Sequence, residues 1–279
     1  MTVGASFNSA SWWNEFGNAD RDYQQLSQLM EFNSQSIAPF SAMGPTPDGR
    51  LKPDIVAPGH WIISAKASPT SDGSCDADTL SKHVTFKAGT SMAAPVSAAT
   101  LALARQYFME GFWPYGSRNR SHAFIPSGSL LKNVAIHSAQ KMTGKRIDSP
   151  YPQCESASTT QSRVHSIPQN RPWFFQGWGR IQLDQALYFA NSNQRRFIHI
   201  PSFSLDVPSS DFHDKSLKSL ETHTYQFCVY PTKEVDIVAS LTWVDPPASL
   251  LSSKQLIHDL DLVVSLDGTK RIGNGETYS

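Results

Sequence analysis

Short apolar runs alternate with stretches of helical periodicity over the first two hundred residues of the chain. Three apolar runs bounded by turn residues predict strands, at Thr2–Ser6, Asp54–Ala57 and Trp61–Ile63. Apolar residues at steps of three and four predict helices at Ser91–Phe108, Leu130–Ser138 and Ile181–Ala190. Strands that alternate with helices of this length favour an α/β fold with a largely parallel sheet.

The pattern changes after about Ile198, where no helical periodicity is left. Runs rich in Val, Ile, Leu and aromatic residues predict the strands of a small β-sandwich, at Tyr225–Tyr230, Val235–Val244 and Leu260–Leu266. The Ser-, Gln- and Pro-rich residues 145–172 predict a long surface loop, with an inter-domain linker as the weaker alternative. The sequence therefore predicts an α/β domain over residues 1–196 and an all-β domain over residues 197–279.

Charge excludes several classes of protein. The 24 basic and 24 acidic residues cancel, so no general affinity for nucleic acid or for an acidic membrane surface is expected. The longest uncharged run, Ala88–Ala104, is too short and too polar to span a membrane and is predicted to be a buried helix.

The cysteines do not have the spacing of a metal site, because no two of them lie within ten residues: Cys75, Cys154 and Cys228. Cys75 and Cys154 can pair if the protein is exported; the alternative is three unrelated small residues. Cys228 alternates with apolar neighbours and is expected to act as a small hydrophobe on a strand.

The stretch Lys87–Val96 holds the strongest candidate chemistry. Ser91 follows Gly89 and Thr90 at the start of the predicted helix, where backbone N–H groups are free and the helix dipole is positive. A nucleophile whose attack generates an oxyanion is favoured at such a position. Judged on these features alone, a capping serine at the head of an ordinary buried helix is the commoner explanation.

The complete string favours the nucleophile. Residues 89–95 match Gly-Thr-Ser-Met-Ala-x-Pro at every fixed position, and the chain thereby resembles the subtilisin-like serine peptidases. Further segments resemble that family in order and spacing over about residues 1–195: Thr2–Ser6, Phe40–Pro45 with Asp48–Gly59, and Gly177–Ile181.

The resemblance implies a three-layer α/β fold with a mainly parallel sheet and a serine endopeptidase activity. It implies that Ser91 forms the acyl-enzyme, that its backbone N–H contributes to the oxyanion hole, and that Gly89 and Thr90 border the substrate channel. The implied partner is a polypeptide substrate, and the family suggests residence outside the cell or in the secretory pathway.

The tail resembles the β-sandwich appended to one subgroup of these peptidases, through Leu241–Pro247 and Asp259–Val264. His258 stands where that subgroup usually has Asn. Asp259 and Asp261 can offer oxygen ligands to a structural Ca²⁺, although solvated carboxylates beside a strand are the commoner case. No other cofactor is expected.

Two members of the catalytic triad are not found in the expected settings. In this family Asp and His precede Ser along the chain, the Asp at a strand end and the His in a His-Gly-Thr stretch. The candidates before Ser91 stand in other settings: His60, His83, Asp48 and Asp54. We therefore expect the catalytic Asp, the catalytic His and the side-chain oxyanion donor to lie outside this chain, and the chain alone to be inactive.

If parts of the catalytic domain lie outside this chain, the chain is a fragment of a longer peptidase, and this affects its expected folding. One edge of the strand Thr2–Ser6 is expected to lack a partner, which would make the isolated chain insoluble or molten. The alternative function is a truncated, non-catalytic pseudopeptidase that binds a partner through the β-sandwich. Such a protein would need Thr90 and Ser91 only for capping.

Overall fold

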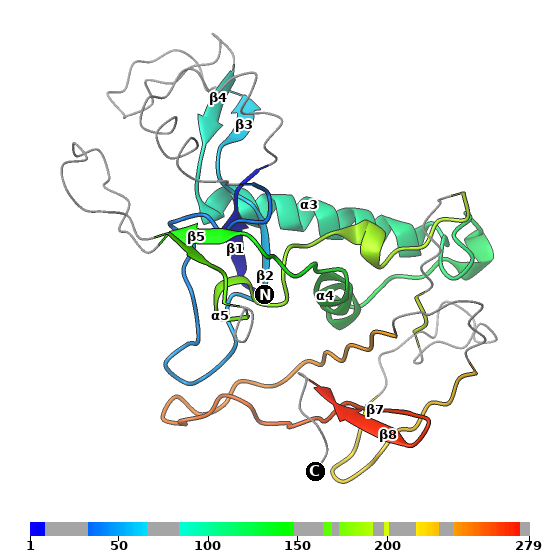
Figure 1. The fold of residues 1–279 in the computed structure, drawn as a ribbon. Coiled ribbons are helices and arrows are strands. Elements are labelled where there is room, and N and C mark those ends of the chain that lie inside the picture. The colour runs from blue at the N-terminus through cyan, green and yellow to red at the C-terminus, as the bar shows by residue number, and fades with distance from the viewer. Residues whose placement is uncertain are drawn as a thin grey trace. The chain divides into compact units, whose positions relative to one another are not determined.

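The computed structural model describes residues 1–8, 33–65, 84–147, 164–168, 173–191, 198–200, 216–228 and 237–273. The chain divides into two compact units, and Figure 1 draws their elements. Unit 1 consists of Met1–Thr100 and Ala139–Ile181, and unit 2 of Leu101–Ser138 and Gln182–Ser279.

Two parallel strands form the centre of unit 1. In the register of β1 (Val3–Ser6) and β2 (Ile55–Pro58), Val3 lies opposite Ile55 and Ser6 opposite Pro58. Both strands bury their middle residues completely, as interior strands of a parallel sheet do. The strands predicted at Thr2–Ser6 and Asp54–Ala57 are confirmed, and their parallel pairing agrees with the predicted, largely parallel sheet.

Single bridges extend this pair on both edges. Arg180 bridges Val56 of β2 in parallel, and Ile37 bridges Ser6 of β1 in antiparallel orientation. The edge of β1 that was expected to lack a partner therefore has one at Ser6.

The Gly-Trp-Gly turn places Arg180 beside β2. Gly177 has φ +56°, and a Cβ there would lie 2.2 Å from the carbonyl oxygen of Pro53. Gly179 has φ +122°, and a Cβ there would lie 2.2 Å from the carbonyl oxygen of Gln140. Both positions require glycine, because the backbone conformation and the space exclude a side chain.

Two antiparallel pairs are the other strands that the structure describes in unit 1. In one, β3 (Ile62–Ala65) pairs with β4 (Val84–Lys87), which confirms the strand predicted at Trp61–Ile63. In the other, β5 (Lys145–Ile147) pairs with β6 (Val164–Ser166). The predicted loop over residues 145–172 is thus wrong at both of these strands.

The buried side-chain amide of Gln176 bonds to one member of a core cluster in unit 1. The cluster consists of Ile37, Val56, Met142 and Ile167. Gln176 ends the short helix α5 (Trp173–Gln176), which the sequence did not predict. Its Oε1 accepts a hydrogen bond from the backbone N–H of Met142, and its Nε2 donates one to the carbonyl of the same residue at 3.0 Å.

Replacing Gln176 by Leu is expected to lower the free energy of unfolding by about 2–4 kcal/mol. The substitution leaves the Met142 N–H and C=O buried without partners, and each unsatisfied group costs about 1–3 kcal/mol. Urea unfolding measures the change. The control is Gln182→Leu, because the exposed contact of Gln182 with Asp184 is worth little. Equal stability of the two variants would contradict the account.

The long helix α3 (Thr90–Met109) confirms the predicted helix to within one residue at each end. Its residues through Thr100 belong to unit 1 and those from Leu101 to unit 2. Pro95 lies inside the helix and has no N–H to donate to the carbonyl of Ser91. Among the described residues, no helix is long and apolar enough to pass through a membrane.

Unit 2 is built on an aromatic core. The helix α4 (Gly128–His137) is capped by the Ser127 Oγ, which accepts a hydrogen bond from the Leu130 N–H at 3.0 Å. This confirms the helix predicted at Leu130–Ser138. The buried core residues are Ala104, Tyr107, Phe108, Trp113, Phe124, Val134, Leu187 and Ile200. Two single turns of 3₁₀-helix, η2 (Arg120–His122) and η3 (Leu183–Gln185), complete the helical part.

The tail segment around Ser240 contacts α4. The Ser240 hydroxyl donates a hydrogen bond to the Asn133 Oδ1 at 2.7 Å and lies 2.9 Å from the His137 Nδ1. Thr242 donates a hydrogen bond to the carbonyl of Ser129 at 2.9 Å. Further on, β7 (Val263–Leu266) and β8 (Thr269–Ile272) form an antiparallel pair.

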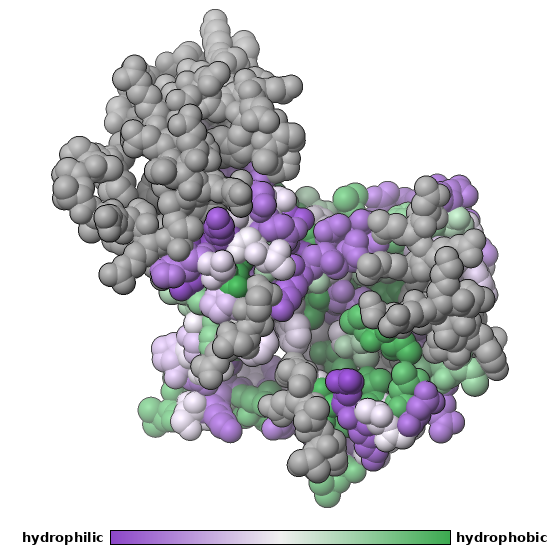
Figure 2. Space-filling model, viewed as in Figure 1, coloured by the Kyte–Doolittle hydropathy of each residue, from purple (hydrophilic) through white to green (hydrophobic). Residues whose placement is uncertain are grey.

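The predicted β-sandwich is not confirmed. β7 falls within the strand predicted at Leu260–Leu266, but residues 225–228 and 237–244 have no regular secondary structure. Apolar side chains such as Leu220, Leu250 and Leu251 are exposed, and Figure 2 shows green hydrophobic residues among purple hydrophilic ones on the face drawn. The boundary between residues 196 and 197 stays a prediction.

Two other predictions differ from the structure. The helix predicted at Ile181–Ala190 is wrong, because only η3 is helical there. Cys228 is a free and exposed cysteine outside any strand, not a residue on one. Cys75 and Cys154 lie outside the described residues, so their pairing stays a prediction.

Candidate active site

Ser91 is exposed at the second residue of α3. β4 ends at Lys87, and the chain turns through Ala88 and Gly89 into the helix. In the described part of the chain, no hydrogen bond joins the Ser91 hydroxyl to another side chain. The first N–H groups of a helix have no acceptor within it, so the Ser91 hydroxyl lies in a positive electrostatic environment.

Gly89 sets the shape of the turn before Ser91. Its φ of +154° is rare for residues with a side chain. Its N–H donates to the carbonyl of Gly59 at 2.8 Å, and its carbonyl accepts from the N–H of Met92 at 3.0 Å. The two bonds join the turn to the end of β2 on one side and to the helix on the other. Gly89 and Thr90 are half-buried beside Ser91, and their place at the border of a substrate channel stays a prediction.

Gly59 allows the closest approach in this region. A Cβ there would lie 2.7 Å from the Cβ of Ala5, 2.8 Å from the carbonyl oxygen of Gly89 and 3.0 Å from the Cβ of Ala93. No side chain fits in this space without moving backbone. The start of α3, the turn before it and β1 therefore meet at Gly59.

His60 is not placed to act as a base. It is 2% exposed, and its ring stacks on Phe7 with centroids 4.5 Å apart and on Phe40 with centroids 5.5 Å apart. Burial lowers the pKa of His60 to about 3, because a charged imidazole would lose its hydration. The interpretation that His60 is not the catalytic base agrees with this geometry. His83 lies outside the described residues.

Acid is expected to destabilise the fold through His60. Unfolded His60 takes up a proton near pH 6.5 and folded His60 only near pH 3. The unfolded state thus binds more protons in that window, and the free energy of unfolding falls by about 1.4 kcal/mol per pH unit on acidification. Urea unfolding of wild type and His60→Phe should diverge by about 2–3 kcal/mol between about pH 7 and pH 4.5. Parallel pH curves would contradict the burial of a neutral His60.

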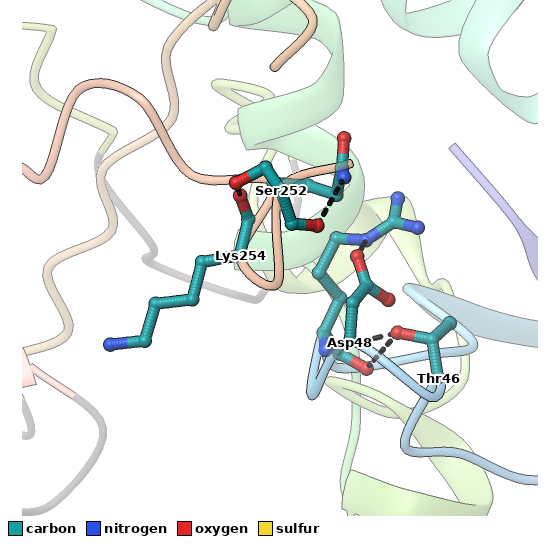
Figure 3. Close-up of polar contacts among 6 residues, drawn as sticks. Thr46, Asp48, Ser252 and Lys254 are labelled. Atoms are coloured by element: carbon teal, nitrogen blue, oxygen red, sulfur yellow. Dashed lines mark hydrogen bonds and ion pairs between the residues drawn. The ribbon is translucent and has the colours of Figure 1, made fainter. Parts of the chain in front are cut away.

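The two aspartates weighed from the sequence have structural contacts. Asp48 accepts a hydrogen bond from the Arg50 Nε at 2.7 Å in a loop closed by Thr46, and these bonds hold the pKa of Asp48 below its usual value (Figure 3). Burial raises the pKa of Asp54, but the Lys52 Nζ at 2.7 Å and the donors of Thr2 outweigh burial and lower it. Asp54 therefore stabilises the start of β1 and is not available for catalysis.

The structure brings the two tail motifs together. The Asp245 carboxylate accepts hydrogen bonds from the backbone N–H groups of Ile257 and His258, and lies 2.8 Å from the His258 Nδ1. Asp259 and Asp261 are exposed. Within the described ranges, no three His, Cys, Asp or Glu side chains are grouped to hold a metal ion. Calcium binding stays a prediction.

A model described as the subtilase family matches residues 1–179, which contain the parallel strands and the turn at Ser91. The chain belongs to the subtilase family. The resemblance of the sequence to the subtilisin-like serine peptidases is thereby confirmed. Membership of this family also supports the predicted α/β fold.

Known proteins with similar sequences carry protease names. The Dictyostelium discoideum "Serine protease/ABC transporter B family protein" tagD is 34% identical over 86% of this subtilase and 14% of its own length. A second protein of that description from the same organism, tagB, is 32% identical over 85% of this chain and 13% of its own length. Serine protease AprX of Bacillus subtilis is 41% identical over 26% of this chain and 17% of its own length. The chain thus spans about one seventh of the two Dictyostelium proteins.

One residue of this subtilase was not predicted as part of the site. Gly59 contacts the turn through Ala88 and Gly89 that leads to Ser91, which is called the nucleophile turn below for its proposed role. The sequence indicated Gly59 only as the last residue of the matching segment Asp48–Gly59. A Pro-Gly pair directly after a buried strand was the available signal, because glycine there permits a close backbone approach.

Proposed function

We propose that this subtilase contributes the nucleophile of a serine endopeptidase, and that the nucleophile is Ser91. The observation that carries the proposal is an exposed serine hydroxyl at the N-terminus of α3, on a turn fixed by the Gly59–Gly89 hydrogen bond. The family match supports a serine peptidase in general.

In this mechanism the Ser91 Oγ attacks the carbonyl carbon of a peptide bond of the substrate. The backbone N–H of Ser91 faces the oxyanion, where the positive end of the helix also stabilises negative charge. Collapse of the tetrahedral intermediate breaks the C–N bond and leaves an acyl-enzyme, and water then releases the acid. Gly89 and Thr90 border the bound substrate chain.

A histidine outside the described residues takes the Ser91 proton and returns it to the leaving amine. His60 cannot take this role, because it is buried between aromatic rings. Asp48 and Asp54 are engaged with Arg50 and Lys52, so the carboxylate that orients the histidine is also supplied from elsewhere in the protein.

Acyl-enzyme formation is tested by a burst experiment on the full-length protein that contains this chain. A p-nitrophenyl ester should release one equivalent of nitrophenol per enzyme before the slower steady state. Alkylation with iodoacetamide is the control, and it should leave the burst intact although Cys228 is exposed. A burst that is lost on alkylation, or one that persists when Ser91 is replaced by Ala, would contradict an acyl-enzyme on Ser91.

A further inference from the structure

We propose that His60 is a positioning residue, which holds the nucleophile turn in place as a flat ring between Phe7 and Phe40. The inference rests on the proposed function, in which Ser91 is the nucleophile. His60 has no role in proton transfer in this account. It acts through Gly59, the residue before it.

The first step of the argument is the stack. The rings of His60 and Phe7 are nearly parallel, at 20°, and those of His60 and Phe40 lie at 13°. Phe7 follows β1, His60 follows β2, and Phe40 follows the segment that bridges β1. The His60 ring thus contacts two other parts of the chain in unit 1, one through each of its stacked neighbours. Stacked ring contacts of this kind stabilise a fold beyond the burial of the rings.

The second step is the backbone beside the ring. The N–H groups of Gly59 and His60 both donate to the carbonyl of Ser6, at 3.0 and 3.1 Å. The next residue, Trp61, has φ +56°, a left-handed conformation that residues with a large side chain rarely adopt. Such a conformation persists only where the surroundings hold it. The stacked ring of His60 and the backbone hydrogen bonds of Gly59 and His60 to Ser6 lie directly before it.

The third step leads from Gly59 to the nucleophile. The Gly59 carbonyl accepts a hydrogen bond from the N–H of Gly89, and a Cβ added to Gly59 would lie 3.0 Å from the Cβ of Ala93, one turn into α3. Ser91 lies between these two contacts. A shift of Gly59 therefore shifts the nucleophile turn, and a displacement of about 1 Å costs on the order of 100-fold in rate.

The role needs the shape of the ring and not its charge. His60 stays neutral above about pH 3, since burial holds its pKa at that value. The aromatic residues described beside it, Phe7, Phe40 and Trp61, carry no charge. Phenylalanine should therefore replace His60 in this role. A leucine of similar size keeps the burial but cannot stack.

The experiment uses the full-length protein and a fluorophosphonate that modifies active-site serines. The maximal rate of inactivation and the concentration for half-maximal rate are measured separately for wild type, His60→Leu and His60→Phe. The assay temperature lies below the thermal transition of each variant. His60→Leu is expected to lower the maximal rate about 10- to 100-fold at unchanged half-maximal concentration. His60→Phe should stay within about threefold of wild type, with the same pH profile.

Ile167→Ala is the matched control for a purely structural loss. Ile167 is 1% exposed in the core of unit 1, so its truncation costs stability without touching the nucleophile turn, and its maximal rate should equal that of wild type. An unchanged rate in His60→Leu, or an equal fall in Ile167→Ala, overturns the proposal. So does a loss of activity in His60→Phe, which would make His60 a proton-transfer group. Absence of labelling in wild type would instead refute the proposed function itself.

Discussion

Replacing Ser91 by Ala in the full-length protein is expected to lower kcat for a peptide substrate about 10⁶-fold. Removal of the serine from subtilisin, which gives the family its name, costs about that much. The reason is chemical: without the hydroxyl no acyl-enzyme forms, and only binding and oxyanion stabilisation are left. KM should change little, because the substitution removes only the hydroxyl and leaves Gly89 and Thr90, the proposed border of the substrate channel, unchanged. Steady-state hydrolysis of a chromogenic peptide measures both constants.

Ser97→Ala is the matched control for this loss. Ser97 belongs to the same helix, is 1% exposed and has no hydrogen-bond partner for its Oγ among the described residues. Removing a buried hydroxyl without a partner is neutral or stabilising, so kcat and thermal stability should both stay near wild type. If Ser97→Ala abolished hydrolysis, or if Ser91→Ala retained more than about 1% of kcat, Ser91 would not be the nucleophile.

Gly59→Ala is expected to lower kcat/KM about 100-fold and the free energy of unfolding by about 1–3 kcal/mol. The added methyl group meets the Cβ of Ala5 at 2.7 Å and the carbonyl oxygen of Gly89 at 2.8 Å. Both contacts are too short to persist. The nucleophile turn or β1 must therefore move, and the Gly59–Gly89 hydrogen bond lengthens. Kinetics and thermal unfolding of the same preparation give the two effects.

Gly128→Ala makes the same chemical change where space is available. Gly128 is the first residue of α4, and a Cβ there would meet nothing within 4 Å. Alanine should be neutral or slightly stabilising, because it restricts the unfolded chain and favours the helix. If Gly59→Ala behaved like Gly128→Ala, the contact between Gly59 and the nucleophile turn would carry no weight.

Local signals predicted the part of the fold that carries Ser91. The periodicity of residues 91–108 predicts α3, and glycine and small residues before and after Ser91 indicate the turn, because backbone conformation there depends on neighbours in sequence. The alternation of strands and helices predicted a largely parallel sheet, and β1 and β2 are parallel, but which strands pair with each other was not predicted.

Contacts between distant parts of the chain decided what sequence reasoning missed. The apolar residues of Ile181–Ala190 are used in packing, with Ala186 and Leu187 buried, although the helix predicted there does not form. The stack at His60 was not predictable either. Phe7 and Phe40 lie far from it in sequence, and nothing in the local pattern of the Pro-Gly-His turn indicates a ring on each side.

The central claim, that Ser91 is the nucleophile of a subtilase active site, is tested most directly by locating a covalent adduct. Full-length protein is treated with a fluorophosphonate, digested and analysed by mass spectrometry. We expect one stoichiometric adduct, on the peptide that contains Ser91, with fragment ions that assign it to Ser91 rather than Thr90 or Ser97. It should disappear in Ser91→Ala. An adduct on another serine, or none in a preparation that hydrolyses peptides, would contradict the account.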